Sequence, residues 1–168
     1  MVSTARLRGR YQITIRAQSG WPVIGQRQVN SPQRSVISWV AMADSTLTKL
    51  GNPEARADRR LEVFETGDPA LRVTLNCAEF TCRCPITGQP DWATITISYV
   101  PAGRIVESKS VKLYMETFRE EGIFHEHLAT TIRDDFVAAL EPRSLEVTVD
   151  FNSRGGIAIS AQSAYDRD

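Results

Sequence analysis

Apolar and polar residues alternate along four separate stretches of this chain, and a period of two is typical of strands with one buried face. The clearest alternation covers residues 92–100, where isoleucines and a tyrosine share one face and threonines and a serine share the other. Residues 72–77, 145–151 and 157–161 alternate in the same way. The pattern therefore predicts four strands, with a further short edge strand at residues 61–64.

Between the second and third of these strands, the period changes to that of an amphipathic helix. Apolar residues spaced i, i+3, i+4 and i+7 predict a helix over residues 107–119, which Gly122 ends. Apolar residues at steps of four predict a second helix over residues 124–140, and Glu141 closes it because a residue before proline disfavours the helical conformation. The order ββααββ predicts an α+β fold, a four-stranded antiparallel sheet with both helices on one face.

The predicted sheet has one face without helices and two unpaired edges. Threonines, serines and an asparagine dominate the uncovered face in the strand patterns. Edge strands invite pairing with other chains, and short sheets of this kind are often closed by joining neighbouring subunits. We therefore expect a ring-shaped homo-oligomer.

Composition narrows the classes of partner. The 168 residues suffice for one domain with a core, and 42% apolar and 24% charged residues are typical of a soluble globular protein. A net charge of zero argues against nucleic acid as the main partner. No apolar run approaches the roughly 20 residues that cross a bilayer, which argues against a membrane protein. Three cysteines, an odd count, favour a reducing cytoplasm over a disulfide scaffold.

The charges are unevenly distributed along the chain. Residues 1–43 contain six arginines and no acidic residue, which resembles an organelle transit peptide but also fits upstream sequence read from an early start codon. We favour the second interpretation, with Met42 as the natural beginning, because 17 arginines against 3 lysines suggest a codon-biased bacterial genome. Residues 1–41 are then a leader that adds nothing to the core, and residues 42–168 form the single domain. Residues 42–66 are polar and are expected to form a linker or a surface arm.

Candidate chemistry is concentrated in residues 81–91, a segment rich in turn-forming residues between two predicted strands. Cys84 lies seven positions before Asp91, so a shaped loop would hold a nucleophile beside a proton donor. Two other interpretations stay open. The segment is also consistent with an ordinary surface loop, and Cys77, Cys82 and Cys84 are consistent with a metal knuckle, although no fourth ligand lies at zinc-binding spacing.

Two further clusters suggest anion binding. Lys109 and Lys112 lie at the predicted start of the first helix, where lysines beside free N–H groups would suit a phosphate. The alternative is an amphipathic helix with a serine N-cap. Arg154 beside Gly155 is either part of a hairpin turn or a phosphate contact.

Both histidines lie in the segment His125-Glu126-His127. On a helix, side chains two positions apart point about 200° apart, so one metal ion cannot take both. His125 and Glu126 are instead expected to form a hydrogen-bonding pair aimed at a ligand, or else a solvated first turn of the helix.

These clusters together resemble the NADPH-dependent 7-cyano-7-deazaguanine reductases of queuosine biosynthesis, in their short single-domain form. The resemblance rests on C-P-I-T-G-Q-P-D from Cys84, E-S-K-S-V-K-L-Y from Glu107, F-H-E from Phe124 and R-G-G-I from Arg154. It implies a tunnelling fold (T-fold), in which ββααββ subunits assemble into barrels with active sites between subunits. Paired pentameric rings are expected on this basis.

The resemblance also implies roles for individual residues. Cys84 would add to the nitrile carbon to give a covalent thioimide, Asp91 would protonate the nitrile nitrogen, and two NADPH molecules would supply hydride. The expected substrate-binding residues are Val106, Glu107, Ser108, His125 and Glu126, and the expected cofactor-binding residues are Ser108, Lys109, Arg154 and Gly155. No metal is expected.

Two alternative functions stay open at the level of sequence: a cyclohydrolase-like zinc enzyme of the same fold, and a non-catalytic purine- or tRNA-binding module. It also stays open whether Cys82 forms a regulatory disulfide with Cys84.

Overall fold

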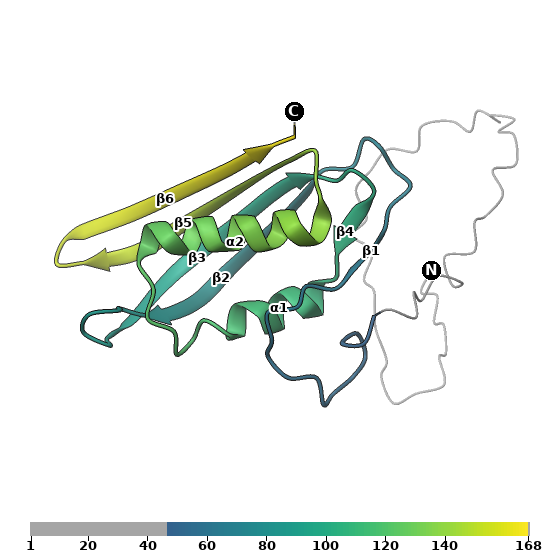
Figure 1. Ribbon diagram of the computed structural model, residues 1–168. Coiled ribbons are helices and arrows are strands. Elements are labelled where there is room, and N and C mark those ends of the chain that lie inside the picture. Colours follow the sequence, from purple (N-terminus) through teal and green to yellow (C-terminus); the bar gives the residue numbers. More distant parts are fainter. Residues whose placement is uncertain (1–46, 168) are drawn as a thin grey trace, which may run out of the picture. The chain divides into compact units, whose positions relative to one another are not determined.

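The computed structural model describes residues 47–167, and its centre is a four-stranded antiparallel sheet (Figure 1). Its strands are β2 (Val73–Arg83), β3 (Pro90–Val100), β5 (Ser144–Arg154) and β6 (Ile157–Asp166). They lie in the order β2-β3-β5-β6, so the two hairpins meet along β3 and β5 at the centre of the sheet. The predicted α+β architecture and the order of its main elements are confirmed.

Two helices cover one face of this sheet (Figure 1). They are α1 (Ser108–Glu116) and α2 (His125–Leu140), and both lie between β3 and β5 in the chain. The core forms where the apolar stripe of each helix meets the inward side chains of the strands, among them Tyr114, Phe136 and Ile95, which are all fully buried. This burial follows from the two predicted periods, since each element presents one apolar face.

The opposite face of the sheet carries polar side chains, as predicted. The hydroxyls of Thr74 and Ser98 lie 3.2 Å apart across β2 and β3, and the amide of Asn76 donates to the hydroxyl of Thr96. No helix among the described residues covers this face. The sheet also leaves β2 and β6 as edge strands within the described part of the chain.

Strand β2 is longer than the alternation in the sequence predicted. Its pairing with β3 shifts between Cys77 and Phe80, which is a bulge that moves the inward set of side chains from odd to even positions. The strand then continues to Arg83, with Cys82 opposite Asp91. The prediction that Asp91 lies in a loop was therefore wrong, because β2 continues past its bulge and pairs with Pro90 and Asp91, which extends β3 backward to include them.

A second, two-stranded sheet lies beside the first. Strand β1 (Val63–Glu65) matches the predicted edge strand, and it pairs with β4 (Arg104–Val106), which the sequence analysis missed. Three residues are too few to show an alternation, and β4 directly follows the turn that ends β3. This small sheet brings the chain from β3 to the start of α1.

Residues 47–62 form an arm that is fastened to the domain at two points. The carbonyl of Glu62, the last residue of the arm, accepts a hydrogen bond from the backbone N–H of Glu107 at 2.8 Å, and its buried carboxylate accepts from the N–H of Thr48 at 3.0 Å. Farther along the arm, the guanidinium carbon of Arg59 lies 3.6 Å from the ring centroid of Phe118. Of the two predicted alternatives, an arm is therefore correct.

The predicted leader, residues 1–41, lies outside the described residues. Within the described part of the chain, no helix has the length and apolar character needed to cross a membrane.

Candidate active site

The hairpin tip between β2 and β3 presents Cys84 at its first position. The backbone N–H of Cys84 donates to the carbonyl of Gln89 at 2.8 Å, and the N–H of Gly88 donates back to the carbonyl of Cys84 at 2.9 Å. Gly88 has φ +68°, a left-handed conformation that glycine adopts without strain. The tip is therefore a closed turn of six residues, 84–89, shorter than the predicted loop.

Cys84 has the chemical environment of an activated thiol. The hydroxyl of Thr87 and the backbone N–H groups of Thr87 and Ile86 donate to its sulfur, and these contacts, with the charge of Arg154, lower the pKa of Cys84 to about 7. Burial opposes this effect only weakly, because Cys84 is partly exposed. A large fraction of the thiol is thus ionised near neutral pH, which is the reactive form.

The other two cysteines are poor nucleophiles. Cys82 is fully buried, and burial together with the nearby Asp91 carboxylate raises its pKa to about 11. Burial also raises the pKa of Cys77 above its ordinary value. All three thiols are free, with no disulfide between Cys82 and Cys84 in this structure. Cys84 is therefore the candidate nucleophile.

Thr87 gives a direct test of this environment. In Thr87→Val the hydroxyl donor is lost, so we expect the pKa of Cys84 to rise toward the ordinary thiol value of about 8.5. Alkylation of Cys84 by iodoacetamide at pH 7 should then slow by about fivefold, because less thiolate is present. The measurement is the rate against pH, followed on the Cys84 peptide by mass spectrometry. Thr87→Ser keeps the hydroxyl and should keep the wild-type midpoint, and an unchanged midpoint in Thr87→Val would contradict the assignment.

Asp91 lies opposite Cys82 in the pairing of β2 with β3, shares Arg154 with Cys84, and is 1% exposed. Its Oδ1 accepts from Nη1 of Arg154, whose Nη2 donates to Oε1 of Gln89 at 3.0 Å. Its other oxygen, Oδ2, is buried and has no hydrogen-bond partner among the described residues. A buried carboxylate oxygen without a partner is costly, so it marks a position where a ligand donor would bind.

The first residue of α2 completes this cluster. Nε2 of His125 lies 3.7 Å from Oδ2 of Asp91, and the imidazole stacks on the ring of Phe151 with centroids 3.6 Å apart. His127 points elsewhere and packs against Phe124, with ring centroids 5.8 Å apart. The predicted divergence of the two histidines is confirmed. Glu126 lies between them in the first turn of α2, with an exposed side chain.

The second predicted cluster, residues 106–109, lies at the other end of α1. The carboxylate of Glu107 caps the helix by accepting from the N–H groups of Lys109 and Ser110, each at 2.7 Å. The prediction of free N–H groups at this helix start was therefore wrong, because a carboxylate of the chain itself already occupies them. Nζ of Lys109 donates to the backbone oxygen of Asn52 in the arm.

The helix separates the two clusters within one chain. The nine residues of α1 span about 13 Å at 1.5 Å per residue. The segment after α1 contacts the Cys84 hairpin, since Arg83 donates to the carboxylate of Glu120 at 2.6 Å. Ser108, at the far end, lines a groove of about 600 Å³ between α1 and the edge strand β2. One chain thus brings together Cys84, Asp91, His125 and Arg154, but not Val106, Glu107, Ser108 and Lys109.

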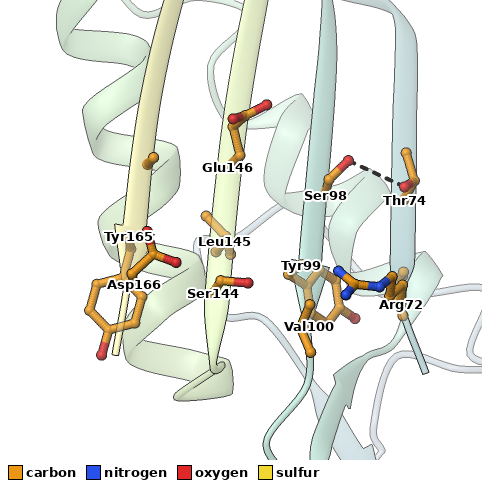
Figure 2. A pocket seen from close by; sticks show the side chains of 12 residues that line it. Arg72, Thr74, Ser98, Tyr99, Val100, Ser144, Leu145, Glu146, Tyr165 and Asp166 are labelled. Atoms are coloured by element: carbon orange, nitrogen blue, oxygen red, sulfur yellow. Dashed lines mark hydrogen bonds between the residues drawn. The ribbon is translucent and has the colours of Figure 1, made fainter. Parts of the chain in front are cut away.

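Figure 2 shows a different hollow, of about 330 Å³, on the open face of the sheet. Arg72, Thr74 and Ser98 contribute to its lining, at the end of the sheet where β2 and β5 begin. The Cys84 hairpin lies at the opposite end of the same strands, about 30 Å away at 3.3 Å per residue. This hollow holds none of the predicted site residues.

Two residues that contribute to the site, Thr87 and Phe151, were not predicted from the sequence. Thr87 donates to the sulfur of Cys84, and Phe151 stacks on His125. Thr87 lies within the C-P-I-T-G segment, so a hydroxyl three positions after the thiol was the available signal. Phe151 gave no signal, because an apolar residue in an alternating strand is expected to be core.

The fold and the site together define a class. A four-stranded antiparallel sheet with two helices on one face is a T-fold domain, and this one gathers an ionisable cysteine and a buried carboxylate around Arg154. Comparison with solved structures agrees on the fold. The chain is similar to the archaeosine synthase QueF-Like in its apo form, with a TM-score of 0.51 and 22% identity over 59% of this chain and 95% of the other.

Sequence comparison identifies the particular family. The profile described as "QueF-like protein" matches residues 90–168. The NADPH-dependent 7-cyano-7-deazaguanine reductase of Frankia casuarinae is 69% identical over 122 residues, covering 73% of this chain and 98% of the relative. That of Syntrophus aciditrophicus is 52% identical, covering 72% of this chain and 87% of the relative. The chain belongs to the NADPH-dependent 7-cyano-7-deazaguanine reductase family.

Proposed function

We propose that this protein reduces the nitrile of 7-cyano-7-deazaguanine to the aminomethyl group, at the expense of two NADPH, as a step of queuosine biosynthesis. The observation that carries this proposal is the pairing of an activated thiol with an unsatisfied carboxylate oxygen. Cys84 has a pKa of about 7, and Oδ2 of Asp91 is buried without a partner among the described residues. Family membership supplies the substrate class and the cofactor.

The first step is the addition of Cys84 to the nitrile. The thiol loses its proton and its sulfur bonds to the nitrile carbon, so that one of the carbon–nitrogen π bonds breaks and the nitrogen takes up a proton. Asp91 carries that proton, and the arriving N–H then satisfies its Oδ2. The product is a thioimide, which accepts hydride far more readily than a nitrile does. Release of the thiolate after the first reduction regenerates Cys84.

The surrounding residues bind and orient the substrate in this proposal. His125 is held against Phe151 and faces Asp91, so its position is fixed before the ligand arrives. Glu126, exposed in the same turn, would accept from the N–H edge of the deazapurine. Val106, Glu107 and Ser108 would complete the pocket.

NADPH, when bound, supplies the two hydrides. The residues expected to hold it are Ser108, Lys109, Arg154 and Gly155, and the structure has features that suit an anionic dinucleotide. Ser108 lines the groove between α1 and β2 together with the cation Lys112, and the guanidinium of Arg154 is 44% exposed. Cationic side chains at an open groove suit phosphate groups.

The test is NADPH oxidation with 7-cyano-7-deazaguanine, followed by the loss of absorbance of the reduced nicotinamide. We expect two NADPH consumed per nitrile and an aminomethyl product identified by mass spectrometry. Binding of the nitrile without NADPH consumption would overturn the proposal in favour of a non-catalytic binding module.

We also infer that the working site forms between subunits of a homo-oligomer, in paired pentameric rings. The support is the separation of the two predicted clusters by α1, together with the unpaired edges β2 and β6. A neighbouring chain at the groove beside β2 would bring Ser108 to a second chain's site, with the polar sheet face lining a tunnel. Light scattering should give a mass of about ten chains, and a monomer that is fully active would contradict this arrangement.

Residues 1–41 are dispensable in this proposal. The Frankia casuarinae relative aligns over 98% of its length within 122 residues of this chain, and the core residues that the structure describes all lie at or after Leu61. A chain shortened to begin at Met42 should keep its thermal stability and its reductase rate. A chain beginning at Leu61 is the control, and it should lose stability because it lacks the contacts of Thr48 and Arg59. Loss of activity on shortening to Met42 would contradict the assignment.

The three free thiols also suit a reducing cytoplasm, where Cys84 would stay reduced.

A further inference from the structure

The short connection between α1 and α2 pairs with the end of β2. The backbone N–H of Arg83 donates to the carbonyl of Glu121 at 2.9 Å, and the N–H of Ile123 donates to the carbonyl of Arg83 at 3.1 Å. Arg83 and Gly122 form a parallel bridge. The connection is therefore attached to the strand that leads directly into Cys84.

Gly122 lies against the backbone of the nucleophile hairpin. A Cβ at this position would come within 3.0 Å of Cα of Pro85, 3.6 Å of its Cβ and 3.7 Å of its nitrogen. The nearest of these is a backbone atom, so the contact cannot be relieved by turning a flexible side chain. Gly122 is not among the glycines with positive φ. A glycine is therefore required here by the close approach of Pro85, and not by the backbone conformation.

The same connection leads into the ligand-facing end of α2. His125, three residues after Gly122, is the first residue of that helix and faces Asp91. Side-chain bonds add to the attachment. Nε and Nη2 of Arg83 donate to Oε2 of Glu120 at 2.7 and 2.6 Å, and Nη1 donates to the carbonyl of Gly88 in the hairpin at 3.2 Å.

We propose that Gly122 is a positioning residue of the reductase, which sets the place of Cys84 through its contact with Pro85 and, through the same connection, the place of His125. The role in turnover rests on the proposed function, whereas the effect on the thiol does not. Displacing Pro85 moves Cys84 relative to the hydroxyl of Thr87 and the charge of Arg154, the groups that favour its thiolate. Catalytic groups must be held within about 0.5 Å of the productive geometry, and a misplacement of about 1 Å can reduce turnover by about 10²-fold.

The test compares Gly122→Ala with Gly67→Ala. Gly67 also lacks a positive φ and has nothing within 4 Å of an added Cβ, so the control makes the same change without the contact. Alkylation of Cys84 by iodoacetamide at pH 7, read on its own peptide, should fall about fivefold or more in Gly122→Ala as the thiolate is lost. The pH midpoint should rise above 7, and kcat should fall with it. Gly67→Ala should match the wild type in alkylation rate, pH midpoint and kcat.

A measurement of thermal stability and a second variant guard against the case in which Gly122→Ala does not fold. Melting temperature is measured for both glycine variants, and if Gly122→Ala does not fold, Arg83→Gln replaces it. That change removes the bonds to Glu120 and Gly88 from a partly exposed side chain, and alkylation should slow by about twofold with the fold retained. Wild-type alkylation and midpoint in folded Gly122→Ala would overturn the proposal, even if turnover were lost. An inactive wild type with the alkylation difference intact would overturn the proposed reaction alone.

Discussion

Replacing Cys84 with alanine is expected to abolish nitrile-dependent NADPH oxidation, with a loss of roughly 10³-fold or more, as is typical when a covalent nucleophile is removed. The physical reason is that a nitrile resists hydride until a sulfur–carbon bond converts it to a thioimide. Intact-mass spectrometry supplies the second measurement. The wild type mixed with 7-cyano-7-deazaguanine alone should gain the mass of one nitrile, and Cys84→Ala should gain nothing.

Cys82→Ala is the matched control, because it makes the same substitution two residues earlier. The Cys82 thiol is buried, and its pKa is raised to about 11, so it should contribute little thiolate. We expect the reductase rate to stay within about twofold of the wild type, with a stability loss of about 1 kcal/mol for the small cavity. An adduct on Cys82 or Cys77, or equal rates in the wild type and Cys84→Ala, would contradict the assignment of the nucleophile.

The sheet and helices were predictable because most of their elements have one buried face, although no residue of the edge strand β6 is buried. Residues 145–151 and 124–140 show a clean period, and both appear as elements with nearly those bounds. Strand bounds were not predictable where the alternation breaks without ending the strand. The bulge after Cys77 shifts the inward side chains by one position, so the last six residues of β2 were left out of the predicted strand, and three of them were assigned to the loop.

For the candidate site, the motifs indicated which residues to consider but not how the fold arranges them. Motifs selected Cys84, Asp91, His125 and Arg154, which the fold brings together. They also selected Glu107, whose carboxylate caps α1 instead of standing free. The spacing of residues in the sequence does not show that α1, a helix of nine residues, separates Glu107 from the Cys84 cluster. Nor does it show that Gly122 contacts Pro85. Such contacts between loops arise from packing, to which no periodic pattern corresponds.

Replacing Asp91 with asparagine is expected to slow formation of the thioimide by about 10²- to 10⁴-fold, the usual contribution of a positioned acid or base. Asparagine keeps the shape of the side chain but cannot carry the proton from the thiol to the nitrile nitrogen. The measurement is the rate at which the adduct mass appears in the absence of NADPH. Asp91 is not among the groups that set the pKa of Cys84, so alkylation by iodoacetamide should keep its midpoint near pH 7.

This contrast separates proton transfer from nucleophile activation. Asp150→Asn is the matched control, because Asp150 lies exposed on β5 and the same substitution there should leave both rates unchanged. Some stability should be lost in Asp91→Asn, since Arg154 loses the carboxylate with which it pairs. The guanidinium remains partly exposed to water, so the domain should still fold. A wild-type rate of adduct formation in Asp91→Asn would show that another group delivers the proton, whereas a parallel loss of alkylation would show that Asp91 acts on the thiol instead.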